Sequence, residues 1–282
     1  MLDIVTERFS AFLPKPIFHQ AHIGESLSLI YSPHYLNHNL YDAILNEPIA
    51  TDLPHDFEQM VAEAVEPDWR IRFLPTLCPG CGWDLEGHRD AMVLLCRNCN
   101  SACTALKDRF VRVRFAHVPD NNPNTVYLPF WRIKTALTGI DLDSFTDFVN
   151  GANLPNASKI KWQDQAFYFW SPAFKIRPQT FLPLATKMTL SEIRQPLEHK
   201  FPDSDLYSVN LPIEEAVETM KINLANLMKH HKTLLPRLPE IQIQAGSYLL
   251  VYVPFLEKHR ELTQPDCNFT ITKTHLSLAD NL

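Results

Sequence analysis

Two pairs of cysteines constrain this chain more than any other feature of its sequence. Cys78 and Cys81 form one Cys-x2-Cys pair, Cys96 and Cys99 form a second, and fourteen residues separate the two pairs. A Cys-x2-Cys turn aims two sulfurs at one point, and two such turns at this separation are typical of one tetrahedral metal site. Four thiolates leave no position for water. The pattern therefore predicts one structural Zn²⁺ ion rather than a catalytic one.

The residues around the cysteines agree with two metal-binding knuckles joined by a hairpin. Gly82 and Asn100 each follow the second cysteine of a pair, at a position that favours a positive φ. Residues 83–85 and 92–95 are predicted to pair, with a turn near residues 87–88. A module of this size is too small to fold alone, so we expect metal binding and folding to be coupled.

Over residues 74–104 the segment resembles the zinc ribbons of rubredoxin-like and transcription-factor-type proteins. The first knuckle, Cys78-Pro-Gly-Cys-Gly82, matches that pattern closely. The second lacks both the proline and the glycine, which disfavours a rubredoxin iron site. A ribbon followed by the strand at residues 126–132 also looks like a group of uncharacterised bacterial zinc-ribbon proteins. The resemblance implies a structural module and no particular activity. An iron electron-transfer site and a metal-free segment are the alternatives.

The composition disfavours several classes of function. Lys and Arg total 26 and Asp and Glu total 32, so the net charge is −6, which argues against broad attraction to nucleic acid or anionic lipid. The seven glycines do not have the spacing of a nucleotide-binding loop. Residues 248–256 are too short an apolar run to be a transmembrane segment. The N-terminus lacks the basic region of a secretory signal. We therefore expect a cytoplasmic protein, in which thiols stay reduced.

Hydrophobic patterning predicts an α+β fold that is β-rich, with a curved antiparallel sheet and a few helices. Strands are expected at residues 17–23, 26–35, 110–118, 126–134, 166–174 and 248–256. Helices are expected at 54–66, 141–150 and 211–231, and a capping-box pattern at 189–192 predicts the start of another. The segment after Gln264 is predicted to be a polar tail.

A repeat of the form aromatic-x-Pro-x-large apolar occurs in four of these segments, at residues 31–35, 127–131, 170–174 and 252–256. Such a repeat predicts similar bends at the corners of a curved sheet, or it occurs by chance in a chain with 22 prolines. Copies on both sides of the cysteines predict a ribbon inserted in one body. Residues 1–72 and 116–282 would form the two parts of that body, and 73–115 the ribbon with flanking stem strands.

The remaining cysteines and histidines give weaker signals. Cys103 is predicted to be a small apolar residue, and Cys267 has no predicted role. The spacings of His19 with His22 and of His34 with His38 permit metal binding, but a second metal site is not expected because their segments are strand-like or irregular.

Two Arg-x-Arg segments flank the ribbon. Arg70 and Arg72 precede it, and Arg112 and Arg114 follow it. If these strands pair as a stem, four guanidinium groups converge on one surface, and such a surface favours an acidic partner. The surface is either solvated and balanced by the protein's own carboxylates, or a docking patch for an acidic protein or a phosphate backbone.

These observations favour a non-catalytic adaptor or assembly subunit that binds another protein through the ribbon and its basic stem. One alternative is nucleic-acid binding by the same surface. Another is an enzyme with a pocket in the aromatic body, rimmed by Tyr31, Tyr127, Trp131, Trp170 and Tyr252. No catalytic residue is predicted, because the sequence contains no GxSxG or HExxH motif and places no carboxylates opposite each other.

Overall fold

The computed structural model describes residues 34–50, 53, 55, 57, 73–138, 168–191, 195–227 and 240–279 of the 282. The chain divides into two compact units, residues 26–73 and residues 1–25 with 74–282. Several predicted elements lie outside the described residues. They are the strand expected at 17–23, residues 26–33 of the strand expected at 26–35, most of the helix expected at 54–66, and the helix expected at 141–150. Arg70, Arg72 and Tyr31 also lie outside the described residues.

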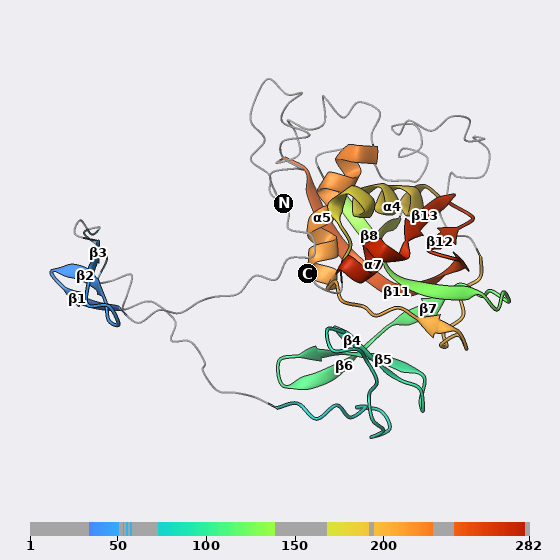
Figure 1. The fold of residues 1–282 in the computed structure, drawn as a ribbon, viewed down its shortest axis with the longest axis horizontal. Helices are drawn as coiled ribbons and strands as arrows, with labels where there is room; N and C mark the ends of the chain where they lie inside the picture. The colour runs from blue at the N-terminus through green and yellow to red at the C-terminus, as the bar shows by residue number, and fades with distance from the viewer. Residues whose placement is uncertain are drawn as a thin grey trace. The chain divides into compact units, whose positions relative to one another are not determined.

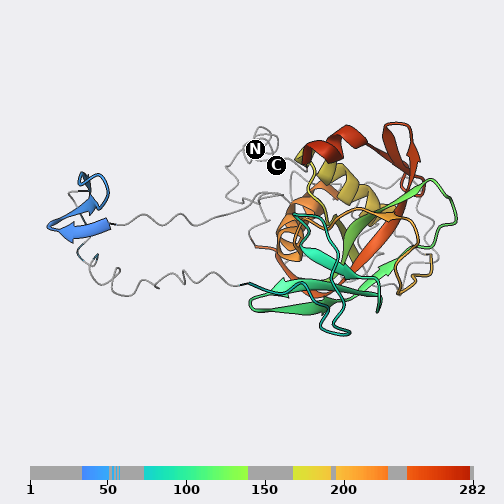
Figure 2. The ribbon, with the colours of Figure 1, turned by 60° about the horizontal axis from the view of Figure 1, so that its bottom comes forward.

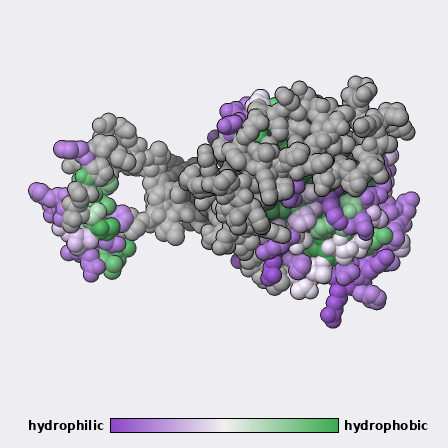
Figure 3. Space-filling view, turned by 90° about the horizontal axis from the view of Figure 1, so that it is seen from above, coloured by the Kyte–Doolittle hydropathy of each residue, from purple (hydrophilic) through white to green (hydrophobic). Residues whose placement is uncertain are grey.

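The smaller unit is an antiparallel sheet of three short strands, β1 (His34–Asn37), β2 (Asn39–Asp42) and β3 (Pro48–Ala50). Its turns are held locally: the carboxylate of Asp42 accepts hydrogen bonds from the amides of Ile44 and Leu45, which lowers its pKa. Hydrophobic and hydrophilic residues are mixed on its surface (Figure 3). Residues 26–73 are one compact unit. The prediction was that residues 1–72 belong to the β-rich body.

The larger unit contains a curled, half-barrel sheet of seven strands (Figure 1). Its strands are β7 (Phe115–His117), β8 (Thr125–Thr138), β9 (Tyr168–Pro172), β10 (Asp205–Leu206), β11 (Gln242–Lys258), β12 (Glu261–Gln264) and β13 (Phe269–Thr272). The long strands β8 and β11 pair antiparallel at its centre, with a bulge between Ala245 and Ser247. The prediction of a β-rich α+β fold with a curved antiparallel sheet is confirmed.

Two of the four copies of the aromatic-x-Pro repeat, at residues 127–131 and 252–256, lie on the central strands of this sheet. Pro129 of β8 faces Tyr252 of β11, and Tyr127 of β8 faces Pro254 of β11. The outer edge of β8 pairs with β10 before Pro129 and with β9 after it. The outer edge of β11 pairs with β7 before Pro254 and with β12 after it. Each proline, which has no N–H to donate, therefore lies where one neighbouring strand is exchanged for the next.

Alternation along the central strands produces two cores. Trp131 and Leu250 belong to one core with residues of α5 (Ile213–Leu227). Phe130 and Val251 belong to the other with residues of α4 (Pro178–Ser191) and α7 (Lys273–Ala279). Successive side chains of a strand point to opposite faces, so β8 and β11 serve both cores.

Two expectations from the sequence are wrong, one about a helix start and one about the C-terminal segment. Thr189 does not begin a helix: it lies near the end of α4, and its buried hydroxyl accepts a hydrogen bond from the Trp170 amide at 3.0 Å. The segment after Gln264 is not a polar tail, because it contains β13 and α7 and buries Ile271 and Leu276. The expected helix at 211–231 is confirmed as α5 over its described part.

The cysteine segment forms its own three-stranded antiparallel sheet, called here the ribbon sheet, within the larger unit (Figure 1, Figure 2). Its strands are β4 (Val93–Cys96), β5 (Ser101–Leu106) and β6 (Arg109–Val113), with β5 in the middle. The predicted pairing of residues 83–85 with 92–95 is not found, because Asp84 pairs with Leu77; the hairpin closes one residue later, where Glu86 and Leu95 exchange two backbone hydrogen bonds of 2.8 Å.

The ribbon sheet is joined to the larger sheet by a shared core and by hydrogen bonds. Val93, Ala102 and Val113 belong to the same core as Trp131 and α5. In addition, the Met92 amide donates to the Val209 carbonyl at 2.7 Å. These contacts fix the ribbon sheet on the body.

Candidate metal centre

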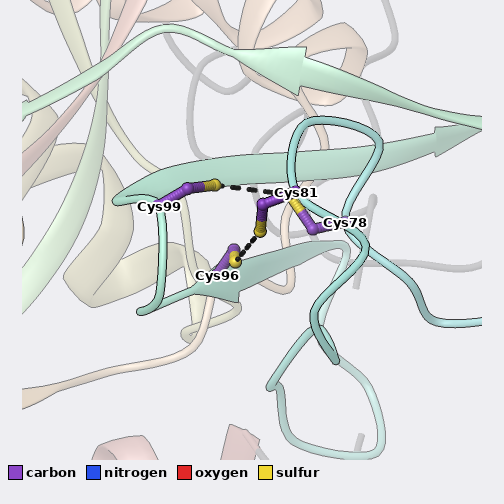
Figure 4. A group of neighbouring side chains, drawn as sticks. All are labelled: Cys78, Cys81, Cys96 and Cys99. Carbon is purple, nitrogen blue, oxygen red and sulfur yellow. Dashed lines mark hydrogen bonds between the residues drawn. The ribbon is translucent and has the colours of Figure 1, made fainter.

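The four cysteines predicted to bind metal lie together. The sulfur atoms of Cys78, Cys81, Cys96 and Cys99 all lie within 4.8 Å of one another. The Cys78–Cys99 and Cys81–Cys96 Sγ distances are both 3.5 Å, and the four side chains point toward one another (Figure 4). A tetrahedral ion with Zn–S bonds of 2.3 Å requires sulfurs about 3.8 Å apart. The spacing therefore fits one tetrahedral ion.

Local backbone geometry explains why these residues form two knuckles. The φ values of Gly82 and Asn100 are +72° and +56°, as expected for the residue after each pair. In the first knuckle the Gly82 amide donates to the Cys78 carbonyl at 2.9 Å, and the Gly80 amide points at the Cys78 sulfur at 3.4 Å. Such donors stabilise a thiolate ligand.

The surroundings of the four sulfurs give them different acidities. The Ser101 hydroxyl, followed by the Gly80 and Cys81 amides, lowers the pKa of Cys78 to about 5. The Asn98 side chain and the Trp83 amide lower the pKa of Cys81. Burial raises the pKa of Cys96 to about 12. Binding of a metal ion to four thiolates would release the protons that the thiols still carry, so the affinity for the ion would depend on pH.

The donor set is closed and sulfur-only, so it can hold one metal ion and leaves no position for a substrate. Among the residues that the structure describes, this is the only group of three or more candidate ligands that lie together. His34 and His38 are not part of such a group, and His19 and His22 lie outside the described residues.

The other two cysteines do not join the site. Cys103 is fully buried in the small apolar cluster beside Leu85 and Phe110, and burial raises its pKa. Cys267 lies 3.7 Å from the Met188 sulfur, and burial raises its pKa to about 11. Both environments favour an inert thiol.

A cleft of about 490 Å³ lies between the ribbon sheet and the larger sheet. Arg112 and Arg114 both line it. The predicted surface of four arginines stays a prediction, because Arg70 and Arg72 lie outside the described residues. In the described part of the chain, β6 pairs with β5. The predicted pairing of residues 69–73 with 110–115 falls on residues outside that part.

Sequence reasoning did not find the other polar residues of the cleft. Arg132, Tyr168 and His199 also line it. A signal for Arg132 was available, because it is the single charge among the apolar residues 126–133 of a central strand. Nothing local marks His199, which is brought to the cleft by a hydrogen bond from its ring to the Phe115 carbonyl at 3.0 Å.

Of the five aromatic residues predicted to rim an enzyme pocket, the four that the structure describes are core residues. Tyr127, Trp131, Trp170 and Tyr252 are each at most 3% exposed. They are buried because α4 and α5 pack over the two faces of the sheet. These side chains therefore do not line an open pocket.

Within the described residues, no helix is both long and apolar enough to cross a membrane. Comparison with protein-family models, with curated proteins and with solved structures gave no match.

Proposed function

We propose that this chain is a zinc-stabilised, non-catalytic adaptor that holds an acidic segment of another protein against the ribbon sheet and its basic residues. The observation that carries the proposal is the cleft, on which Arg112 and Arg114 converge. No carboxylate is present among the described residues that line it. Guanidinium groups in such a place favour an anionic partner.

The metal has a structural role in this proposal. Cys99, Asn100 and Ser101 of the second knuckle form part of the cleft wall. An ion bound to Cys99 would hold that wall in place, and the closed donor set gives the ion no chemistry to perform. Zn²⁺ is the metal that best fits four thiolates without a redox role, and a reducing compartment such as the cytoplasm keeps those thiols free.

Exposed apolar side chains of the cysteine segment support a protein partner. Trp83 is 59% exposed, and Leu77 and Leu106 are about half exposed. Aromatic side chains, like arginine, are enriched where proteins dock. Nucleic-acid binding through the same arginines is the second candidate, and the net charge of −6 opposes it.

The proposal is tested by affinity purification of the tagged full chain from its native host. We expect the wild-type protein to retain one zinc and one stoichiometric acidic protein, and the Arg112→Ser/Arg114→Ser variant to lose the partner. The control is Lys258→Ser/Arg260→Ser, which removes the same charge at the far end of β11. Equal retention by both double variants would overturn the proposal, and salt-sensitive retention of DNA alone would favour nucleic acid.

A further inference from the structure

The arginines of the cleft are arranged by the register of three neighbouring strands. Arg132 of β8 lies directly opposite Leu249 of β11. Leu250 pairs with Phe115 and donates to the Arg114 carbonyl at 3.1 Å, so Arg114 lies beside Leu249 on the other side. Residues in register on adjacent strands share a face. Arg114 and Arg132 therefore flank Leu249 on one face of the sheet, roughly 10 Å apart at their backbones.

Arg132 is held in place by an aromatic ring. Its guanidinium carbon lies 3.8 Å from the centroid of the Tyr168 ring and 5.9 Å from that of Trp170. A stacked guanidinium keeps its edge N–H groups free to donate. Arg132 is thus positioned before any ligand arrives, which lowers the entropy lost on binding.

Arg112 has a different role from the other two arginines. Its guanidinium packs so closely on Gly80 of the first knuckle that a Cβ there would lie 1.7 Å from Nη2. A metal ion with four thiolates carries a net negative charge. Arg112 would lie against that charge and offset part of it, in addition to lining the cleft, so Arg114 and Arg132 would carry the greater share of a ligand's charge.

His199 and Ser101 also line the cleft. The ring of His199 donates through Nδ1 to the Phe115 carbonyl, so Nε2 is an acceptor in the neutral ring and donates to a ligand only when the ring is protonated. The Ser101 hydroxyl lies 3.1 Å from the Cys99 sulfur and 3.5 Å from the Cys78 sulfur, so its hydrogen serves the cysteines and not a ligand. The two guanidiniums alone offer more N–H donors than one carboxylate can accept.

We propose that this cleft binds a phosphate monoester dianion between Arg114 and Arg132. A phosphate group offers three terminal oxygens and two negative charges, which match paired, preorganised guanidiniums better than a carboxylate does. The cleft volume of about 490 Å³ accommodates a phosphorylated side chain or a small phosphorylated metabolite. This inference rests on the proposed function, because Arg114 takes part in both the surface for the acidic partner and the phosphate site.

The test is calorimetric titration of the zinc-loaded full chain with O-phosphotyrosine, O-phosphoserine and adenosine 5′-monophosphate, against tyrosine, serine and adenosine. We expect each phosphate monoester that binds to do so at least ten-fold more tightly than its unphosphorylated counterpart. Tighter binding of the phosphoamino acids identifies a modified side chain of a partner as the ligand. Tighter binding of the nucleotide identifies a free metabolite as the ligand. Either order of affinities supports phosphate binding in the cleft.

Variants locate the binding. Arg132→Ser should weaken phosphate binding at least ten-fold. Arg132→Lys should weaken it less, because lysine keeps the positive charge; some loss remains, because lysine lacks the planar guanidinium that stacks on Tyr168 and donates two parallel N–H groups. Lys258→Ser/Arg260→Ser is the matched surface control. Zinc content and circular dichroism check folding, and Arg114→Ser replaces Arg132→Ser if the latter does not fold. Unchanged affinity in the folded variants, or no preference for phosphate, would overturn the inference.

The two proposals fail separately. If no phosphate monoester binds but the acidic partner is still lost from Arg112→Ser/Arg114→Ser, the adaptor function stands and the phosphate site does not. If phosphate binds the purified chain but no partner is retained, the cleft assignment stands and the adaptor function does not.

Discussion

The chain contains two small three-stranded sheets of similar size and very different surroundings. The strands of β1–β3 and of the ribbon sheet, β4–β6, are three to six residues long and antiparallel. In β1–β3, Leu36 is 41% and Ile49 is 53% exposed. In the ribbon sheet, Val93, Ala102 and Val113 are at most 9% exposed and join the core of the larger sheet.

The comparison shows what stabilises a sheet this small. An isolated three-stranded sheet buries little apolar surface and needs an additional constraint. The described part of β1–β3 is closed by backbone pairing and by turn hydrogen bonds such as those to Asp42. The ribbon sheet has two further constraints, the cysteine cluster and the shared core. Removing each in turn should make the ribbon sheet more like β1–β3.

The largest expected effect follows from removing a metal ligand. Cys96→Ser takes away a fully buried sulfur, and three remaining ligands bind zinc far more weakly. We expect zinc content to fall from one ion per chain to near zero. Hydrogen exchange of β4–β6 should rise to the level of β1–β3, and the melting temperature should drop by about 10 °C or more.

Cys267→Ser is the control for this change, because Cys267 is half-buried and lies outside the cluster. It should keep its zinc and its exchange pattern. Full zinc occupancy in Cys96→Ser, measured by mass spectrometry of the metal, would show that the ribbon sheet does not depend on the four-sulfur site.

The convergence of the four cysteines could be predicted from the sequence, whereas the cleft could not. All four cysteines lie within residues 78–99, and the geometry of each knuckle depends on its own turn, including the positive φ of Gly82 and Asn100. The cleft brings together Arg114, Arg132 and His199 through strand register and a long-range hydrogen bond. Neither of these is encoded in local spacing.

Fold prediction succeeded where periodicity was strong and failed where polar residues concealed burial. The apolar stripe of α5 and the run at 248–256 were sufficient to predict their elements. After Gln264 the sequence is mostly polar, but pairing with β12 and packing against α4 bury Ile271. The capping-box spacing at Thr189 was overridden by the tertiary contact of its hydroxyl with Trp170.

An intermediate effect should come from weakening the shared core. Val93 is 4% exposed and packs with residues of the larger sheet, so Val93→Ala should lower the free energy of unfolding by about 1–3 kcal/mol. Leu106→Ala, at a side chain of the ribbon sheet that is 54% exposed, should change it by about 0.5 kcal/mol or less. Urea denaturation of the zinc-loaded proteins measures both.

Equal losses in these two variants would mean that the shared core contributes nothing beyond ordinary surface packing. In that case the metal alone would distinguish the ribbon sheet from β1–β3. A loss confined to Val93→Ala, with zinc retained, shows that the second constraint acts independently of the first.

The smallest expected effect concerns one hydrogen bond between the ribbon sheet and the body. Asn100 has a positive φ, and its side-chain oxygen accepts a hydrogen bond from the Phe201 amide at 2.8 Å. Asn100→Gly relieves the backbone strain but leaves that amide unpaired, so we expect the free energy of unfolding to fall by about 1 kcal/mol.

Lys107→Gly is the matched change, because Lys107 also has a positive φ and lies in the exposed β5–β6 turn. It should be neutral or slightly stabilising. If urea denaturation gives both variants the same free energy of unfolding, the ribbon sheet is not held to the body through Asn100. If Asn100→Gly is less stable than Lys107→Gly by about 1–2 kcal/mol, the difference measures the hydrogen bond between the Asn100 side chain and Phe201.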